Sequence, residues 1–304
     1  MKKIAYVLVL ITAFAFSACK NKGSVDDNGM PKTLVIGMVE TEKMDQIKNV
    51  REEIRKYLQK KLGMPVEVLY SNDYVGVIEA LRAKKIHMAE FPPFAYVIAT
   101  RSIPLKPIIT LGTNGKPVAY QSVLIVNSKS NLKTMDDVKA HSEDLTLCFV
   151  DPASTSGHLI PRAYLNSIGL NPDTAFKQTI FAGSHSASVL SVKSGKIDIG
   201  CTTDLIFGLM IQNKLLKDGD VRILWRSAPI VSDPIVVRND LNKDLVKRIQ
   251  NAYLTIDKDD PSILKSYMQM FFHDTIRRTF IVAHDSSFNG LRKIAASVKG
   301  LKAN

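Results

Sequence analysis

The stretch LTLCFVDPASTSGHLIPRAYLNSIG, Leu145–Gly169, combines a short apolar run, a polar turn and an amphipathic segment. The apolar run is typical of a β-strand, which ends at Asp151 and Pro152 because proline cannot continue strand pairing. The three hydroxyl residues 154–156 follow where a helix would begin, with a cap to fill and unpaired backbone N–H groups. We therefore predict a strand, a polar elbow and a helix.

Such an elbow offers hydrogen-bond donors to an anion. The helix dipole, the free N–H groups and the hydroxyls of Ser154, Thr155 and Ser156 would converge on one place without a cationic side chain. The alternative is an ordinary N-cap that serves only its own helix, since serines are common at caps and this is not a P-loop.

The composition is that of a folded protein with one large or two medium domains, because 45% of the 304 residues are hydrophobic. The formal net charge is +12, but lysine and arginine are scattered and the densest cluster, Lys60-Lys61, is brief. No RNA-binding or helix-turn-helix signature is present, so nucleic acid is not an expected partner. A diffuse positive field favours the attraction of small anions.

The N-terminus is typical of an exported lipoprotein. Two lysines precede an apolar run, and small residues lead to Cys19. We expect residues 1–18 to be a cleaved signal peptide and the thiol of Cys19 to carry a lipid, which would anchor the protein in the cell envelope at a periplasmic or extracytoplasmic membrane face. A plain signal peptide or an uncleaved anchor is the alternative. Residues 19–32 are polar and predict a flexible tether.

The rest of the chain has the pattern of an α/β protein. Short β runs alternate with segments of helical spacing, which is typical of a mainly parallel sheet. Long β runs at 120–126 and 221–237 indicate two crossings between lobes. We expect two doubly wound, mainly parallel sheets, with residues 33–118 and 235–304 in lobe 1 and residues 119–234 in lobe 2. A small ligand would lie in the cleft between them.

Four segments in this order resemble the phosphonate- and phosphite-binding proteins that serve bacterial ABC importers, and the resemblance covers residues 33–290. The segments are SNDYVGVIE (71–79), SVLIVN (122–127), DPASTSG (151–157) and PIVSDPIV (229–236). The resemblance implies a type II two-lobed binding protein that captures a small phosphorus oxyanion for import. An ABC permease and its ATPase would be its partners, and no cofactor is expected.

The same resemblance implies which residues contact the ligand. The positions are Ser154, Thr155 and Ser156 for the oxyanion, Tyr74, Tyr120 and His185 around it, and Asp233 for an amine of the ligand. The alternatives are ordinary half-buried tyrosines and a structural loop histidine.

Two departures from the family concern the ligand rather than the fold. Glu90 and Phe91 precede a double proline where many relatives have an aromatic residue and a Gly-Pro turn. Asp204 lies close to the position of a second amine-binding carboxylate of some relatives, without a clear match to it. Glu90 is either the missing charge or a solvated rim residue, and recognition of an amine stays open.

Patterns of catalysis and metal binding are missing from the sequence. There is no HExxH, no GxSxG, no nucleophile beside a base and no Cys/His metal spacing, so we expect a monomeric binding protein rather than an enzyme. Ser156 and His158 would point in different directions on a helix, and we place His158 on the helix surface. The alternative function is a protein that signals ligand to a membrane kinase or chemoreceptor.

Two cysteines, Cys148 and Cys201, remain after Cys19. Both lie in β runs that we expect to be neighbouring parallel strands, where the Cβ geometry seldom suits a disulfide, so free thiols are predicted. Cys201 near the cleft would also leave an opening for a thiophilic ligand such as arsenite.

Overall fold

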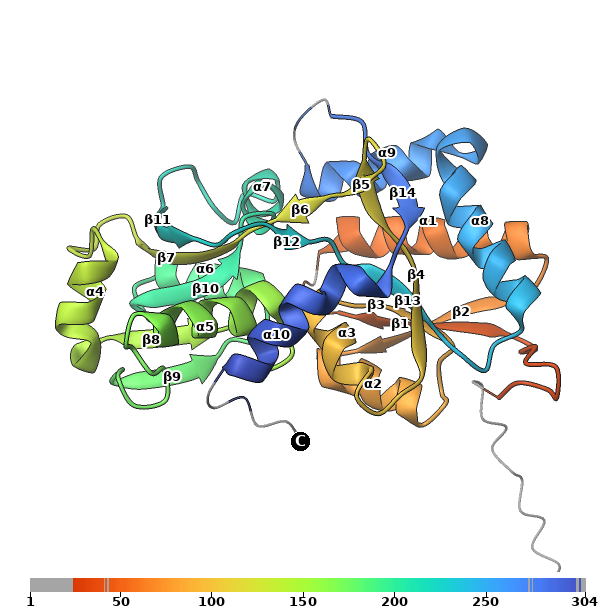
Figure 1. The fold of residues 1–304 in the computed structure, drawn as a ribbon. Helices are drawn as coiled ribbons and strands as arrows, with labels where there is room; N and C mark the ends of the chain where they lie inside the picture. The colour runs from red at the N-terminus through yellow and green to blue at the C-terminus, as the bar shows by residue number, and fades with distance from the viewer. Residues whose placement is uncertain are drawn as a thin grey trace, which may run out of the picture.

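The computed structural model describes residues 24–40, 42, 44–272, 274, 276–298 and 301. The expected signal peptide and Cys19 lie outside these residues. None of the helices within the described ranges has the length and apolar character needed to cross a bilayer. The chain forms two lobes that lie side by side, each around its own β-sheet (Figure 1).

The first lobe contains a seven-stranded sheet of order β14-β4-β13-β3-β1-β2, with β5 paired to β4. The strands are β1 Leu34–Val39, β2 Val66–Ser71, β3 Met88–Glu90, β4 Leu105–Thr113, β5 Lys116–Pro117, β13 Pro234–Arg238 and β14 Thr279–Val282. The helices are α1 Asp45–Leu62, α2 Tyr74–Arg82, α3 Pro93–Ala99, α8 Lys243–Asp259, α9 Pro261–Phe271, the short η3 Asp285–Phe288 and α10 Asn289–Ser297.

The second lobe contains a five-stranded sheet of order β11-β7-β10-β8-β9. The strands are β7 Ser122–Asn127, β8 Thr146–Phe149, β9 Gln178–Phe181, β10 Ile199–Thr203 and β11 Val221–Arg226. The helical segments are α4 Met135–His141, η1 Ser142–Asp144, η2 Thr155–Leu159, α5 Ile160–Ser167, α6 His185–Lys193 and α7 Ile206–Gln212. A two-stranded ribbon of β6 Ala119–Tyr120 and β12 Ile230–Val231 lies between the lobes (Figure 1).

Both sheets are mixed, although we expected mainly parallel ones. Strands β1, β2 and β3 are parallel, as are β8, β9 and β10, because a helix connects each to the next. Strands β4 and β13 in the first lobe, and β7 and β11 in the second, adjoin the crossings between lobes and pair antiparallel. Strand β13, on which the chain returns to the first lobe, runs opposite to β3 and β4, and β7, on which it enters the second lobe, runs opposite to β10 and β11.

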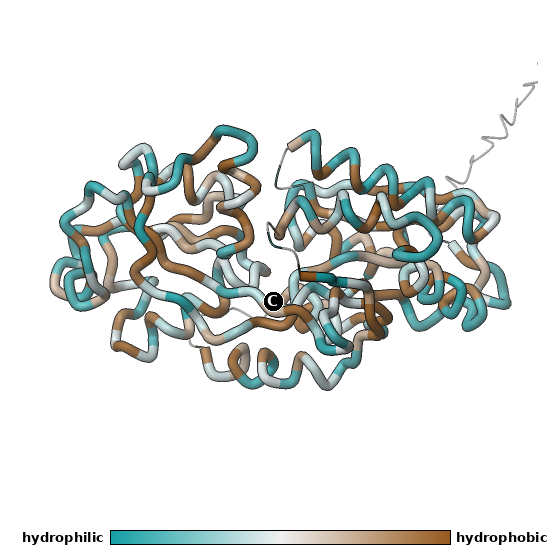
Figure 2. Tube along the Cα trace, turned by 90° about the horizontal axis from the view of Figure 1, so that it is seen from above, coloured by the Kyte–Doolittle hydropathy of each residue, from teal (hydrophilic) through white to brown (hydrophobic). Residues whose placement is uncertain are grey.

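Buried apolar side chains fill both lobes and continue from one lobe to the other. Hydrophobic segments run through the interior of each half, while the outer helices alternate hydrophobic and hydrophilic residues (Figure 2). Ala153 and Leu159 of the elbow belong to one buried cluster with Phe91 and Phe94 of the first lobe. Full burial of a leucine such as Leu159 contributes about 2 kcal/mol, so the elbow is held against the first lobe as well as within its own.

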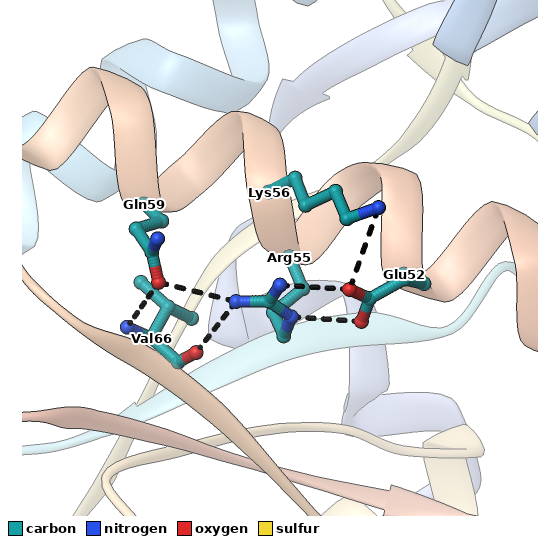
Figure 3. A network of polar contacts seen from close by, with 5 residues as sticks. All are labelled: Glu52, Arg55, Lys56, Gln59 and Val66. Carbon is teal, nitrogen blue, oxygen red and sulfur yellow. Dashed lines mark hydrogen bonds and ion pairs between the residues drawn. The ribbon is translucent and has the colours of Figure 1, made fainter.

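A polar network holds α1 against the start of β2 (Figure 3). The Arg55 guanidinium donates to both carboxylate oxygens of Glu52, each at 2.7 Å, and to the carbonyl of Val66 at 3.0 Å. The side-chain oxygen of Gln59 accepts from Arg55 at 3.1 Å and from the Val66 N–H at 3.3 Å. The partly exposed ion pair contributes less than about 1 kcal/mol by itself, and the fork geometry fixes the position of α1 relative to the sheet.

Residues 24–32, within the predicted flexible tether, fold onto the first lobe. Val25 and Pro31 form a β-bridge, and Asn242 donates to the carbonyl of Gly29 at 2.8 Å through its backbone N–H. Gly29 has φ +77°, and a Cβ there would lie 2.5 Å from the Asp240 carbonyl oxygen. The globular part therefore begins before residue 33.

Cys148 and Cys201 are unpaired, as predicted, and lie in the neighbouring parallel strands β8 and β10. Cys148 is opposite Gly200 in the register, so Cys148 and Cys201 point to opposite faces of the sheet and pack in different clusters. Burial raises the pKa of the Cys148 thiol to about 11 and that of Cys201 well above its usual range.

We therefore predict that both thiols are unreactive in the native protein. In a variant carrying Cys19→Ser, a thiol reagent at pH 8 should modify no cysteine before denaturation and two cysteines after it, because both sulfurs are enclosed and protonated. A count below two after denaturation would show a disulfide.

Candidate functional site

A cavity of about 180 Å³ lies between the two lobes. Its lining in the first lobe comes from β1, α1, the starts of α2 and α3, the end of β3, and α9. The second lobe contributes the elbow, the start of α6, the end of β10 and the start of α7, and the ribbon contributes Tyr120. The C-terminal ends of strands from both sheets thus meet at one cavity, which is where α/β folds bind ligands.

The elbow after β8 has the predicted form. Ser154 is the N-cap residue, and its Oγ accepts a hydrogen bond from the Gly157 N–H at 3.0 Å. The helix begins as one wide π-type turn, η2, before α5. A Cβ on Gly157 would lie 2.4 Å from the Cβ of Val150, so the tight approach of the elbow to β8 requires glycine.

The three hydroxyl residues of the elbow have different surroundings. Ser154 and Ser156 line the cavity, whereas Thr155 does not and is completely buried. The Thr155 Oγ1 accepts from the Phe94 N–H of α3 at 2.8 Å, which joins the elbow to the other lobe. The elbow is thus both a helix cap and part of the cavity wall.

Tyr74 and His185 occupy equivalent places in the two lobes. Tyr74 is the first residue of α2, capped by Asp73, and His185 is the first residue of α6, capped by Ser184. Both line the cavity, so α2 of the first lobe and α6 of the second both begin at it. Burial lowers the pKa of His185, and the carboxylate of Glu42 opposes this shift.

Two carboxylates cross from one lobe to the other at these helix N-termini. Glu42 of the first lobe accepts from the backbone N–H groups of His185 and Ser186 at 2.7 and 3.2 Å. Asp151 of the second lobe lies near the backbone N–H of Tyr74, which acts to lower the pKa of this carboxyl. Each carboxylate meets the positive end of a helix in the other lobe. Burial, with a smaller contribution from Asp73, raises the pKa of Asp151.

Tyr120 and Asp233 adjoin the ribbon and interact with each other. Burial and the charge of Asp233 raise the pKa of Tyr120, and hydrogen bonds with Thr155 and Ser156 oppose this shift. Burial and the nearby Glu90 raise the pKa of Asp233 well above its usual range, against a hydrogen bond with Tyr120. The predicted contacts Ser154, Ser156, Tyr74, Tyr120, His185 and Asp233 thus line one cavity.

Of the remaining predicted site residues, one lines the cavity and two do not. Glu90 lines the cavity and accepts a hydrogen bond from the Tyr267 hydroxyl at 2.7 Å, so it is not a solvated rim residue. Phe91 is completely buried, and its neighbour Pro92 lines the cavity instead. Asp204 accepts from the Gln121 N–H at 2.9 Å beside the ribbon and does not line the cavity.

Cys201 is also outside the cavity lining and fully buried. The structure therefore gives no support to an opening for arsenite at this thiol. Among the residues that the structure describes, no group of three or more His, Cys, Asp or Glu side chains is arranged to hold a metal ion.

His158 is buried behind the elbow, which corrects its expected place on the helix surface. Its Nδ1 lies 2.8 Å from the Pro152 carbonyl oxygen, and its Nε2 accepts from the Arg162 Nε at 2.9 Å. Burial lowers the pKa of His158 to about 4. Arg162 in turn forms a two-pronged ion pair with Asp173, so a chain of polar contacts supports the elbow from behind.

The pKa of His158 predicts acid sensitivity of the free energy of unfolding. The unfolded chain takes up the proton near pH 6.5 and the folded protein only near pH 4, so stability falls as the pH drops below about 6.5. Between pH 7 and pH 5 wild type should lose about 2 kcal/mol more than His158→Gln, which keeps a donor and an acceptor but does not titrate. Urea unfolding at both pH values measures this, and equal losses would contradict it.

Two sheet-based lobes joined by a short ribbon, with a cavity between them, define a periplasmic binding protein of the type II fold. The sequence model of the family described as "ABC transporter, phosphonate, periplasmic substrate-binding protein" matches residues 36–290. The chain belongs to this family of periplasmic substrate-binding proteins, as the sequence motifs indicated.

Three relatives illustrate the similarity. The chain is 29% identical to the phosphate-import protein PhnD of Mycolicibacterium smegmatis, over 82% of this chain and 79% of that protein. It is 28% identical to the phosphonates-binding periplasmic protein of Escherichia coli K12, over 84% and 75% of the two chains. PhnD1 of Prochlorococcus marinus, solved with methylphosphonate, shares the fold with a TM-score of 0.73 at 22% identity, over 87% of this chain and 97% of that one.

Proposed function

We propose that the protein is the lipid-anchored receptor of an ABC importer that captures a phosphonate, phosphite or related small phosphorus oxyanion as a monomer. The single observation that carries the proposal is the elbow, whose Ser154 and Ser156 line the same cavity as Tyr74 and His185. This arrangement offers hydroxyl and backbone donors to an anion that enters between the lobes.

The proposed mechanism is closure of the two lobes around the anion. The oxyanion accepts hydrogen bonds from the elbow of the second lobe, and Tyr74 and Pro92 of the first lobe form the opposite wall. The closed form is the one that the permease recognises. Contacts that need both lobes, such as the Phe94–Thr155 hydrogen bond, favour this form.

The wall also supplies a basis for selecting among phosphorus compounds. A phosphonate presents three oxygens on one side and carbon on the other, whereas phosphate has a fourth oxygen that would face Pro92 and the tyrosine rings. Leaving a buried oxygen without a hydrogen-bond donor costs about 1–3 kcal/mol.

We predict that a phosphorus oxyanion with an apolar or hydrogen substituent binds at least tenfold more tightly than phosphate, because of this wall. Calorimetry with methylphosphonate, 2-aminoethylphosphonate, phosphite, phosphate and sulfate measures it. If phosphate binds most tightly, the proposed selectivity against phosphate is wrong. If no phosphorus compound binds, the proposed function is wrong.

Removal of one elbow hydroxyl should weaken every phosphorus ligand. Ser156→Ala deletes a donor to a charged group, for which a loss of about 1.5–3 kcal/mol is expected. Ser167→Ala, at the exposed end of α5, is the matched control and should bind as wild type does. Equal affinities of both variants and wild type would show that the Ser156 hydroxyl of the elbow does not bind the ligand.

The lipid anchor has its own test. Expressed in a bacterial host, wild type should fractionate with membranes and release an N-terminal peptide that carries acyl chains on Cys19, while Cys19→Ser should be released in soluble form. Mass spectrometry that finds unmodified Cys19 in the mature wild-type protein would contradict the anchor.

A further inference from the structure

A buried arginine lies behind the elbow. Arg162 belongs to α5, six residues after Ser156, and its side chain is only 5% exposed. Six residues of helix rise about 9 Å and helical side chains lean towards the N-terminus, so the guanidinium lies within about 10 Å of the elbow. Neither Arg162 nor its neighbour His158 lines the cavity. A positive charge is therefore placed close to the proposed anion site but outside the cavity.

The hydrogen bonds between Arg162 and the elbow allow only one form of the His158 ring. The Arg162 Nε can only donate, so the His158 Nε2, at 2.9 Å, is the acceptor. The Pro152 carbonyl oxygen can only accept, so the His158 Nδ1, at 2.8 Å, carries the ring proton. The ring is therefore neutral, in keeping with its pKa of about 4, and the positive charge of this chain of contacts resides on the guanidinium.

The same contacts hold the peptide group with which the elbow begins. His158 donates to the carbonyl of Pro152, and the N–H of Ala153, in the same peptide group, donates to Asp151 Oδ1 at 2.7 Å. Asp151 is buried, so its carboxylate is a negative group within the loop that is proposed to bind the anion. An anion at the elbow is disfavoured by this carboxylate unless a positive charge nearby compensates for it.

Asp173 pairs with Arg162 without cancelling its charge at the elbow. The two terminal nitrogens of the guanidinium donate to Asp173, each at 2.9 Å. The Asp173 side chain is 48% exposed, so water screens the carboxylate far more than it screens the enclosed guanidinium. Burial raises the pKa of the Cys201 thiol and the charge of Arg162 opposes this rise, which shows that the charge acts beyond its own ion pair.

We propose that Arg162 determines the affinity of the site without touching the ligand, because its buried charge stabilises a phosphorus oxyanion at the elbow and offsets the carboxylate of Asp151. His158 is the neutral spacer that keeps the guanidinium at a fixed distance from the elbow. This inference rests on the proposed function, since the elbow must hold the anion.

Calorimetry with methylphosphonate at pH 8, where His158 is neutral, tests the role of the charge. Arg162→Gln keeps a donor for His158 but removes the charge. It should weaken binding about tenfold, as expected for two unit charges about 10 Å apart at an effective dielectric constant of about 20. Arg162→Lys keeps the charge and should recover most of the lost affinity.

Asp173→Asn separates the effect of the charge from mechanical support of the elbow. The substitution breaks the ion pair, so the melting temperature should fall. It also removes a negative charge, so methylphosphonate should bind about twofold more tightly than to wild type. Support of the elbow alone predicts weaker binding in both Arg162→Gln and Asp173→Asn, because each variant breaks the same chain of contacts.

The exposed ion pair of Arg82 and Glu79 on α2 is the matched control. Arg82→Gln and Glu79→Gln change the net charge by the same amounts and should bind methylphosphonate as wild type does. Wild-type affinity in Arg162→Gln, or no gain of affinity in Asp173→Asn, would overturn the inference while the proposed function stands. If wild type binds neither methylphosphonate, 2-aminoethylphosphonate nor phosphite, the proposed function itself is wrong.

Discussion

The backbone N–H groups at the starts of α2 and α6 need hydrogen-bond partners. The groups that supply these partners determine much of the arrangement around the cavity. Both helices begin where the lobes face each other, at the cavity. Asp73 and Ser184 satisfy one N–H each from within their own lobe. Glu42 reaches the first turn of α6 from the opposite lobe, and Asp151 lies near the first N–H of α2 in the same way, so each helix N-terminus gains a carboxylate when the lobes are together.

Local sequence patterns were sufficient for the elements near the elbow. The hydroxyl run, the proline and Gly157 lie within a few residues of one another. The end of the strand and the start of the helix therefore depend on local backbone hydrogen bonding, which the sequence shows directly. The two-lobed α/β fold followed from the alternation of β runs and helical segments, together with motifs in a family's order. The antiparallel strands were missed because the direction of a strand depends on where the chain re-enters the sheet.

The residues that were missed depend on contacts between distant segments. Glu42 stands in no motif, and its partner His185 is 143 positions away. Glu90 and Tyr267 are 177 positions apart, so nothing near Glu90 could decide between a rim residue and a cavity residue. His158 was placed on the surface by helical geometry, whereas Phe149 and Phe181 from two strands enclose its ring, at centre distances of 4.8 and 5.0 Å.

The ribbon of β6 and β12 has a mechanical consequence for capture. Each strand is only two residues long, and Tyr120 belongs to β6 while Asp233 follows β12 by two positions. If the lobes close by rotating about this ribbon, as in the proposed mechanism, residues next to it move less than His185 and Tyr74, which lie on the two lobes. Tyr120 and Asp233 would then keep nearly the same separation during closure, so an incoming ligand would meet two residues that are already in place.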